Sequence, residues 1–320
     1  MNSRSKIGVF LKGGLGNQLF QIAAGLYSSE GEPIDIFSDF TEPRKTNSVA
    51  DALYFKWPQE VHVNETKSNK FERKTLALSL KYALEVKPTT LEKILLRFIK
   101  TFSDLLFSLR FKEPTNIFSG EGVGFCKIRL KPGRNLLNGY FQAHQYPSDR
   151  AVSAQLRNLR LLQQSESLNW WIEKAKAERP IIVHLRLGDY KYEKGIGVLP
   201  PSYFEKALVN IQAKESSKNI WIFTDEIALV DQFITLPSVF SVRVIGDNGL
   251  NPAETLELMR YGSAYVIANS TFSWWAAFLS YQTGCTTIMP TPWFQNMPSP
   301  IGIKPRDWIE VEIHKLNEVE

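Results

Sequence analysis

Cysteine and histidine are scarce in this chain, and neither is clustered. Two cysteines, Cys126 and Cys285, and four histidines are spread over 320 residues, and no CxxC pair occurs. Such a sequence has no disulfide framework and no thiolate zinc site, and its histidines lack the spacing of metal ligands. An Asp-x-Asp pair is also missing. We therefore expect no bound metal and no cofactor.

The chain also lacks a long hydrophobic run. No stretch reaches the roughly 18 apolar residues that a membrane-spanning helix needs. The first apolar run, residues 7–11, is short and leads directly into Lys12 and two glycines, unlike the core of a signal peptide. These features predict a cytoplasmic protein in a reducing compartment.

Positive charge is missing from most of the chain and concentrated in one segment. The formal net charge is +5, but residues 67–112 hold eleven Lys or Arg and four Asp or Glu, a local surplus of +7. The rest of the chain therefore sums to −2, which excludes a uniformly basic nucleic-acid-binding protein. The local surplus needs a local explanation.

The last part of this basic segment, residues 91–112, has the pattern of an amphipathic helix. Its apolar residues recur at helical spacing from Leu91 to Phe111, while Lys93 and Arg97 fall on other faces. Two interpretations remain open. The segment is either a core helix with a solvated basic face, or an interfacial helix that makes peripheral contact with an anionic membrane, on its inner face.

The order of predicted elements indicates an α/β protein. Composition is that of a folded globular chain, and the length suggests two domains. Residues 6–37 have a strand–helix–strand pattern. In the second half we expect strands at 180–185, 219–224, 242–245, 264–268 and, as the last, 285–289, with helices between them. This alternation, with a period of about 30 residues, predicts a parallel, doubly wound sheet.

In doubly wound sheets, ligands bind at the carboxyl ends of the strands, which places the site in four loops. The first holds Gly13-Gly14-Leu15-Gly16 at a strand-to-helix turn. Glycines there let backbone N–H groups approach a phosphate. No Walker A lysine follows, and Leu19 stands where the dinucleotide fingerprint has its third glycine, so a simple tight turn is the alternative.

The second loop follows a buried strand and contains an arginine. Alternation along the strand puts His184, Arg186 and Gly188 on one face, with Leu185 and Leu187 on the other. An arginine at this position can hold a phosphate through two hydrogen bonds. The alternative is an internal Arg–Asp ion pair at the strand end.

The third and fourth loops supply further polar groups. Asp225 can accept a hydrogen bond from a ribose hydroxyl or a base amine, or it can be a helix N-cap. Asn269, Ser270 and Thr271 crowd the start of the next predicted helix. Capping needs one such residue, so three in succession favour a ligand, and an anion in particular.

Taken together, five motifs resemble the bacterial α-1,2-fucosyltransferases of glycosyltransferase family 11. They occur in the family's order and are GGLGNQLFQ from Gly13, LNGYFQAHQY ending at Tyr146, VHLRLGDY at 183–190, FTD at 223–225 and IANSTFSWWAAFL at 267–279. The resemblance implies a GT-B fold, in which two Rossmann-like domains face a cleft. Residues 1–160 would form an acceptor-side domain with a basic helical insert at about 67–112, and residues 161–320 the GDP-fucose-binding domain.

The resemblance also implies the reaction. A family member transfers L-fucose from GDP-β-L-fucose to the 2-hydroxyl of a galactose in a glycan, with inversion and without metal. Arg186 would stabilise the charge that develops on the β-phosphate, and Asp189 would accept the proton, with Glu193 or no dedicated base as alternatives. The implied donor-binding residues are Gly14, Gly16, Asn17, His184, Asp225, Asn269, Ser270, Thr271 and Phe272. The residues that bind the acceptor stay unknown.

One position departs from the family pattern. The usual motif is H-x-R-R-G-D, and here Leu187 replaces the second arginine. The change puts acceptor preference or the finer donor contacts in question more than fucosyl transfer itself. Three other functions were weighed: a related transferase with another acceptor or sugar nucleotide, a nicotinamide or flavin oxidoreductase, and a non-catalytic nucleotide- or sugar-binding module.

Overall fold

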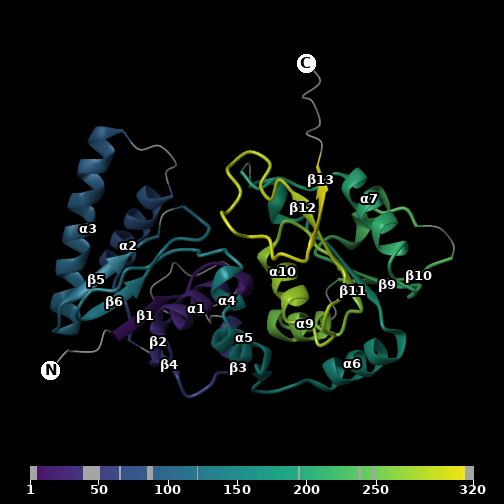
Figure 1. Ribbon diagram of the computed structural model, residues 1–320, viewed down its shortest axis with the longest axis horizontal. Helices are drawn as coiled ribbons and strands as arrows, with labels where there is room; N and C mark the ends of the chain where they lie inside the picture. Colours follow the sequence, from purple (N-terminus) through teal and green to yellow (C-terminus); the bar gives the residue numbers. More distant parts are fainter. Residues whose placement is uncertain are drawn as a thin grey trace. The chain divides into compact units, whose positions relative to one another are not determined.

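The computed structural model describes residues 6–38, 51–64, 66–84, 89–120, 122–193, 195–236, 239–246 and 249–313. The chain divides into two compact units (Figure 1). The first comprises Met1–Arg160 and Pro300–Lys304, and the second comprises Leu161–Ser299 and Pro305–Glu320. The short segment 300–304 thus packs with the first unit, although the sequence assigned it to the second.

The first unit is built on a five-stranded parallel sheet. Its order is β4-β2-β1-β6-β5, and every neighbouring pair is parallel. These strands are β1 (Lys6–Phe10), β2 (Ile34–Phe37), β4 (Val61–Asn64), β5 (Thr115–Phe118) and β6 (Arg134–Leu137). Helix α1 (Leu15–Ser29) joins β1 to β2, which confirms the strand–helix–strand start predicted for residues 6–37.

The remaining elements of this unit surround the sheet. They are η1 (Asp51–Tyr54), β3 (Phe55–Lys56), α2 (Lys70–Ala83), α3 (Thr90–Phe111), α4 (Gln145–Ser148) and α5 (Arg150–Arg157). Strand β3 pairs with β7 (Arg160–Leu161). Leu76 of α2 and Phe107 of α3 pack against Phe10 and Phe37 of the sheet, so both helices contribute to the core.

The second unit contains a six-stranded parallel sheet. Its order, β10-β9-β8-β11-β12-β13, is 3-2-1-4-5-6 in chain order, the Rossmann order. The strands are β8 (Ile181–Leu185), β9 (Asn219–Thr224), β10 (Ser241–Ile245), β11 (Ala264–Val266), β12 (Thr287–Thr291) and β13 (Ile309–Glu312). Its helical elements are α6 (Glu166–Glu178), η2 (Asp189–Lys191), α7 (Pro201–Gln212), η3 (Ile227–Leu229), α8 (Val230–Phe233), α9 (Pro252–Met259) and α10 (Thr271–Phe278). The predicted α/β class with two Rossmann-like domains is therefore confirmed.

The edge of the second sheet differs from the prediction. The expected last strand, 285–289, lies two residues later as β12, and a further strand, β13, follows it. In β13 only Val311 is buried, because charged residues alternate with apolar ones at this edge of the sheet. The pattern is too short and too polar to be recognised as a strand in the sequence.

Helix α3 forms where it was expected, and only part of its apolar surface enters the core. Thr89 and Glu92 form a capping box that starts it at Thr90. Within the helix the buried residues are Ile99, Ser103 and Phe107, while most of its apolar side chains are exposed. The interpretation as a core helix with a solvated basic face therefore holds for one side of the helix only, because the apolar stripe on another side stays exposed. No helix in the described part of the chain combines the length and hydropathy that a membrane crossing requires.

Candidate active site

Arg186 lies just beyond the carboxyl end of β8, where β8 and β11 are neighbours and the strand order reverses. Its guanidinium makes two ion pairs, from Nη2 to Asp189 Oδ1 at 2.9 Å and from Nη1 to Asp225 Oδ2 at 3.1 Å. Although burial opposes the charge, the two carboxylates raise the pKa of Arg186. The internal Arg–Asp pair named as the alternative is thus present, and the Arg186 side chain is 34% exposed.

Asp225 accepts hydrogen bonds from the backbone of the loop that carries Arg186. Its Oδ1 accepts a hydrogen bond from the backbone N–H of Leu187 at 2.9 Å, and its Oδ2 accepts one from Gly188 at 3.1 Å. Both oxygens are therefore occupied by the loop as well as by the arginine. Asp225 is not a helix N-cap, since Glu226 has that place before η3.

Gly188 and Leu187 explain the shape of this loop. A Cβ at Gly188 would come within 2.8 Å of Asp225 Oδ2, so the carboxylate can reach the loop because residue 188 is glycine. Leu187 is fully buried and belongs to the hydrophobic core of this unit. The residue that replaces the family's second arginine therefore points into the core, on the side away from Arg186 and its carboxylates.

Tyr190 links the arginine loop to the loop after β11, and sequence reasoning missed it. The Arg186 guanidinium lies over its ring, 5.6 Å from the centroid. The Tyr190 hydroxyl donates to Asn269 O at 3.4 Å and is hydrogen-bonded to the Ser270 side chain. Its position four residues after Arg186, in the same loop, was the only signal that could have indicated it.

The three polar residues at 269–271 have different places. Asn269 is buried, and its Nδ2 donates to Ile196 O at 3.2 Å and Gly197 O at 2.9 Å, which ties down the loop before α7. Ser270 is the N-cap residue of α10, but its side chain makes no capping hydrogen bond. Thr271 is the first residue of α10. The positive end of this helix dipole therefore lies beside the loop that carries Arg186.

His184 is a buried, neutral imidazole under this site. It is 6% exposed, and its ring lies 6.1 Å from that of Phe272 at the start of α10. Burial, and secondarily the charge of Arg186, lower its pKa to about 3. Its Nδ1 and the Asn269 Oδ1 have no hydrogen-bond partner among the described residues. One of these atoms lies on β8 and the other in the loop after β11, so both could form a hydrogen bond with a ligand at this edge of the sheet.

A second group of predicted residues lies at the carboxyl end of β1, in the first unit. Gly13 has φ of +74°, and a Cβ there would come within 2.6 Å of Asn17 Nδ2. Gly14 is the N-cap residue of α1, and Gly16 lies in its first turn. Asn17 Oδ1 accepts a hydrogen bond from Gln142 Nε2 at 2.9 Å. The motif ending at Tyr146 therefore contributes directly to the glycine-rich turn.

Lys12 is the second residue that the sequence did not identify. It follows β1, and its Nζ donates to Asn138 Oδ1, in the loop after β6. Burial lowers its pKa to about 7. Gln21 accepts from the backbone N–H of Lys12 at 2.9 Å and donates to its carbonyl at 3.1 Å, which fixes this stretch of backbone. A lysine in an apolar-looking strand end gave no pattern to recognise.

The structure thus brings the predicted residues into two groups. Arg186, Asp189, Asp225, His184 and residues 269–272 gather at the carboxyl edge of the second sheet. Gly14, Gly16 and Asn17 lie at the equivalent edge of the first. Among the described residues no group of three or more His, Cys, Asp or Glu side chains could hold a metal ion.

A sheet in the Rossmann order with an arginine at its switch point is an arrangement that many nucleotide-binding α/β proteins share. A comparison with family models is more specific. The model of "Glycosyl transferase family 11" matches residues 6–312, so the chain belongs to glycosyltransferase family 11 and is a glycosyltransferase.

Two relatives from Escherichia coli have related activities in their names. The chain is 25% identical over 305 residues to the O-antigen biosynthesis glycosyltransferase WbnK, covering 89% of this chain and 93% of that protein. It is 29% identical over 142 residues to an alpha-1,2-colitosyltransferase, covering 41% of this chain and 47% of that protein.

Solved structures with a similar chain path are also glycosyltransferases. The α-1,6-fucosyltransferase NodZ, crystallised with GDP, is 14% identical with a TM-score of 0.46, covering 85% of this chain and 91% of that one. POFUT1 in complex with GDP-fucose is 12% identical with a TM-score of 0.45, covering 95% of this chain and 98% of that one.

Proposed function

We propose that this glycosyltransferase is a galactoside α-1,2-fucosyltransferase, which moves L-fucose from GDP-β-L-fucose to a galactose 2-hydroxyl with inversion and without metal. The observation that carries the proposal is Arg186. It is a partly exposed cation at the sheet switch point, next to the N-terminus of α10. Motif resemblance supports fucose, and the name of the colitosyltransferase relative supports an α-1,2 linkage.

The chemistry requires a fixed positive group at the leaving phosphate. As the bond between the sugar and the β-phosphate breaks, negative charge builds up on GDP, and preorganised donors stabilise that charge most effectively. Arg186 is such a donor because Asp225 and the neighbouring backbone hold its loop. The N-terminus of α10 adds the partial positive charge of its helix dipole.

Donor binding also has to displace one ion pair. Asp189 is 60% exposed and Asp225 is 24% exposed, so Asp189 is the carboxylate that can leave Arg186 at lower cost. A diphosphate then takes its place on Nη2. This exchange would free Asp189 as the acid–base group near the reacting carbon.

The proton of the acceptor hydroxyl has three possible destinations, Asp189, Glu193 or the leaving phosphate. For Asp189 as the base, we expect Asp189→Asn to lower kcat by about 10²–10⁴ and to remove the acidic limb of the pH–rate profile. Glu193→Gln is the matched comparison in the same loop. Normal kcat and an unchanged pH profile in Asp189→Asn would show that Asp189 only positions Arg186.

The other donor-binding predictions stay proposals of the same kind. Gly14, Gly16 and Asn17 would present backbone and amide groups to the diphosphate. His184, Asn269, Ser270, Thr271 and Phe272 would line the nucleotide side, and the unpartnered Asn269 Oδ1 and His184 Nδ1 are available there as hydrogen-bonding atoms. Asp225 would act through the Arg186 loop more than on the nucleoside, because its oxygens already accept from that loop.

A second candidate is transfer of a related sugar such as colitose. The relative named an alpha-1,2-colitosyltransferase favours it, since 29% of the 142 aligned residues are identical. The same site would serve, because the leaving group is again a nucleotide phosphate. The two candidates differ only in the sugar that the donor carries.

The experiment is transfer by the purified enzyme, read by mass spectrometry of the acceptor. GDP-fucose and a colitose donor are each offered with a panel of galactosides, with and without EDTA. We expect one added deoxyhexose, unchanged by EDTA, and a linkage at the galactose 2-position by NMR. Strict dependence on added metal would refute the metal-free mechanism, and turnover only with the colitose donor would establish the second candidate.

We further propose a cytoplasmic location. Cys126 and Cys285 form no disulfide among the residues that the structure describes, and Cys126 is buried, as is usual for proteins of reducing compartments. Cell fractionation of the tagged full-length chain tests this, and recovery from an oxidising compartment would contradict it.

A further inference from the structure

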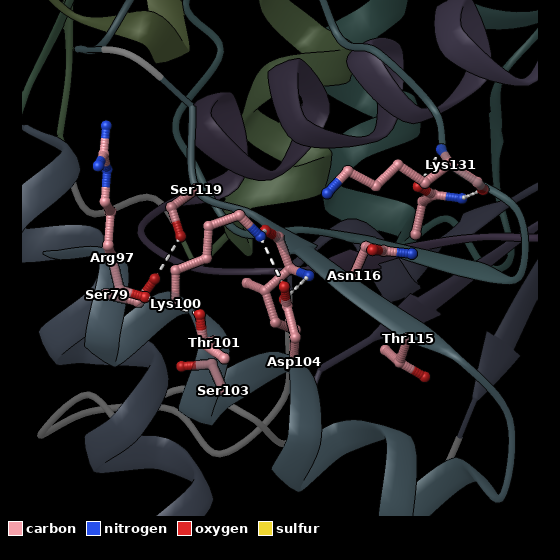
Figure 2. Close-up of polar contacts among 12 residues, drawn as sticks. Ser79, Arg97, Lys100, Thr101, Ser103, Asp104, Thr115, Asn116, Ser119 and Lys131 are labelled. Atoms are coloured by element: carbon pink, nitrogen blue, oxygen red, sulfur yellow. Dashed lines mark hydrogen bonds and ion pairs between the residues drawn. The ribbon is translucent and has the colours of Figure 1, made fainter.

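Helix α3 is attached to its unit by its polar side. Lys100 Nζ donates to Asp104 Oδ2 at 2.8 Å and to Ile117 O at 3.0 Å, and Asp104 Oδ1 accepts from the backbone N–H of Ile117 at 2.6 Å (Figure 2). Ser108 accepts from the backbone N–H of Thr115 at 2.9 Å. These contacts fix the rotation of the helix against strand β5.

Helix α2 is locked to the same assembly. Arg110 of α3 pairs with the buried Glu72 of α2 at 2.5 Å. The hydroxyls of Ser79 and Ser119 lie 2.6 Å apart, which connects α2 to the segment after β5 (Figure 2). The two helices therefore form one firmly held pair, seen side by side in Figure 1.

With its polar side inward, α3 turns an apolar stripe outward. Six of the stripe's residues are spaced by four and three residues alternately, so they share one helix face. The six residues are Leu91, Leu95, Phe98, Phe102, Leu105 and Leu109. The exposed Ile94 adjoins them and is counted as part of the stripe. Leu91, Phe98 and Leu109 are 76%, 70% and 71% exposed. A contiguous exposed apolar stripe of this kind marks an interaction surface.

Helix α2 extends the stripe and adds charge to it. Phe71 is exposed and meets Phe102 edge-on, with ring centroids 5.9 Å apart. Leu78, also exposed, lies two turns further along the same face as Phe71. Lys74 and Lys81 lie on that face of α2 as well, alternating with the two apolar residues.

Four basic groups around the stripe have no acidic partner among the described residues. Lys74, Lys81, Lys93 and Arg97 are exposed and make no ion pair with any residue that the structure describes. Figure 2 shows Arg97 pointing away from the Lys100–Asp104 contact. Residues 67–112 keep their surplus of +7.

We propose that the α2–α3 face docks on a membrane surface rich in anionic headgroups. The helix lies in the plane of the interface with its stripe in the acyl boundary, while Lys74, Lys81 and Arg97 reach headgroup phosphates. A helix of 22 residues is about 33 Å long, so the stripe offers a long, shallow contact. A second copy of the chain is the less favoured occupant, because it would bring one +7 segment against another.

The test is vesicle flotation with the full-length protein. Phosphatidylcholine vesicles are compared with vesicles that also contain phosphatidylglycerol, at low and at high salt. We expect binding only with the anionic lipid, weakened at least tenfold by high salt. Equal binding to both compositions, or none to either, overturns the proposal.

Two pairs of substitutions separate the two contributions. Phe98→Ser with Leu105→Ser removes exposed apolar area and should weaken binding at least tenfold. Lys74→Gln with Lys81→Gln should weaken it about fivefold for each lysine removed. Matched controls on α7 of the other unit are Val209→Ser and Lys206→Gln, both exposed, and neither should change binding.

Self-association is resolved in the same samples. Sedimentation without lipid should show the same state for the wild type and for the Phe98→Ser/Leu105→Ser variant. The proposal is overturned if the wild type is a dimer and this variant is a monomer. It is also overturned if vesicle binding is unchanged by both pairs of substitutions.

Membrane docking and the proposed transfer reaction can fail independently. All substituted residues lie away from the candidate site, and unchanged thermal melting shows that each variant is folded. We expect wild-type turnover of a water-soluble acceptor in every variant. Loss of vesicle binding with full turnover therefore reports on the surface alone.

Discussion

Arg186 is held by two carboxylates with unequal exposure, and this inequality separates their roles. The Asp225 side chain is 24% exposed and accepts from two backbone N–H groups, whereas the Asp189 side chain is 60% exposed. Asp225 therefore fixes the loop that carries Arg186, and under the proposed function Asp189 would be the carboxylate that the donor displaces. The sequence named all three residues, but it left open whether Arg186 pairs with an aspartate and which one.

Removing the arginine should disable catalysis. We expect Arg186→Ala to lower kcat by about 10²–10³, the usual effect of losing a donor that stabilises transition-state charge. The measurement is initial-rate kinetics with the sugar nucleotide at saturation. Arg243→Ala is the matched control, since Arg243 also pairs with a carboxylate, Glu178, at 2.9 Å in the same unit. Full activity in Arg186→Ala would rule out its assigned role.

Lys12 makes stability depend on pH in a defined direction. Its pKa is lowered to about 7 in the folded chain, below the ordinary lysine value of about 10.4, so the unfolded chain binds the extra proton between these values. Stability therefore rises with pH above 7, by up to about 1.4 kcal/mol per pH unit from this group. Below pH 7 the Lys12 amine is protonated in the folded chain as well, and its desolvated charge lowers the stability of the fold.

The prediction is a difference between two unfolding series. Denaturant unfolding of wild type from pH 7 to 9 should show a rise in the free energy of unfolding that Lys12→Met lacks. Lys206→Met, at an exposed position, should keep the rise. Parallel pH dependences in wild type and Lys12→Met would mean that Lys12 titrates normally.

At the scale of elements, α9 and α10 are joined by a buried charge cluster. Arg260 and Glu257 are each 1% exposed and pair at 2.8 Å. The Tyr281 hydroxyl donates to Glu257 at 2.6 Å, and Arg260 Nε donates to Leu279 O at 3.0 Å. Every charged atom here has a partner, which makes loss of one member costly.

We expect Glu257→Ala to lower the free energy of unfolding by about 3–5 kcal/mol, because it leaves the buried guanidinium of Arg260 without its carboxylate partner. Replacing both Glu257 and Arg260 with leucine should cost much less. Urea denaturation measures both. The surface pair Glu173–Lys176, at 2.7 Å, is the control, and Glu173→Ala should leave the midpoint nearly unchanged. Equal losses for the single and double variants would contradict this account.

Most elements could be predicted, and the failures share a cause. Strand 219–224 was predicted with the bounds observed, because it is a short apolar run that begins and ends at polar residues. Strand β13 was missed because it lies at the sheet edge with charged residues facing outward. Periodicity reports burial, so elements that are only half-buried give weak signals.

At the scale of the whole molecule, the chain returns to the first unit near its end. Phe125 donates its backbone N–H to Ile301 O at 2.8 Å, and His144 donates to Gly302 O at 2.7 Å. Gly124 permits this contact, since a Cβ there would overlap the backbone of Ile301. The two units are thus joined by more than one passage of the chain.

Gly124→Ala should therefore displace residues 300–304. We expect a loss of about 2–4 kcal/mol in stability, from steric overlap with backbone that cannot move aside cheaply. Hydrogen exchange should show reduced protection at Ile303, whose N–H bonds to Pro300 O at 3.3 Å. Gly31→Ala is a useful comparison, because nothing lies within 4 Å of a Cβ there, although its φ of +94° adds backbone strain. Unchanged protection in Gly124→Ala would contradict the close contact.

The sequence by itself determined the α/β class, the repeated strand–helix units and the loops that carry the site. It could do so because carboxyl ends of parallel strands meet at one edge, so motif positions along the chain translate into neighbours in space. Tertiary structure alone decided which carboxylates hold Arg186, that Lys12 donates to Asn138, and that α3 turns its apolar stripe outward. A helical period shows that one face of α3 is apolar. The direction of that face depends on the contacts of Lys100 and Asp104 with the backbone of β5, and the helical period carries no information about those contacts.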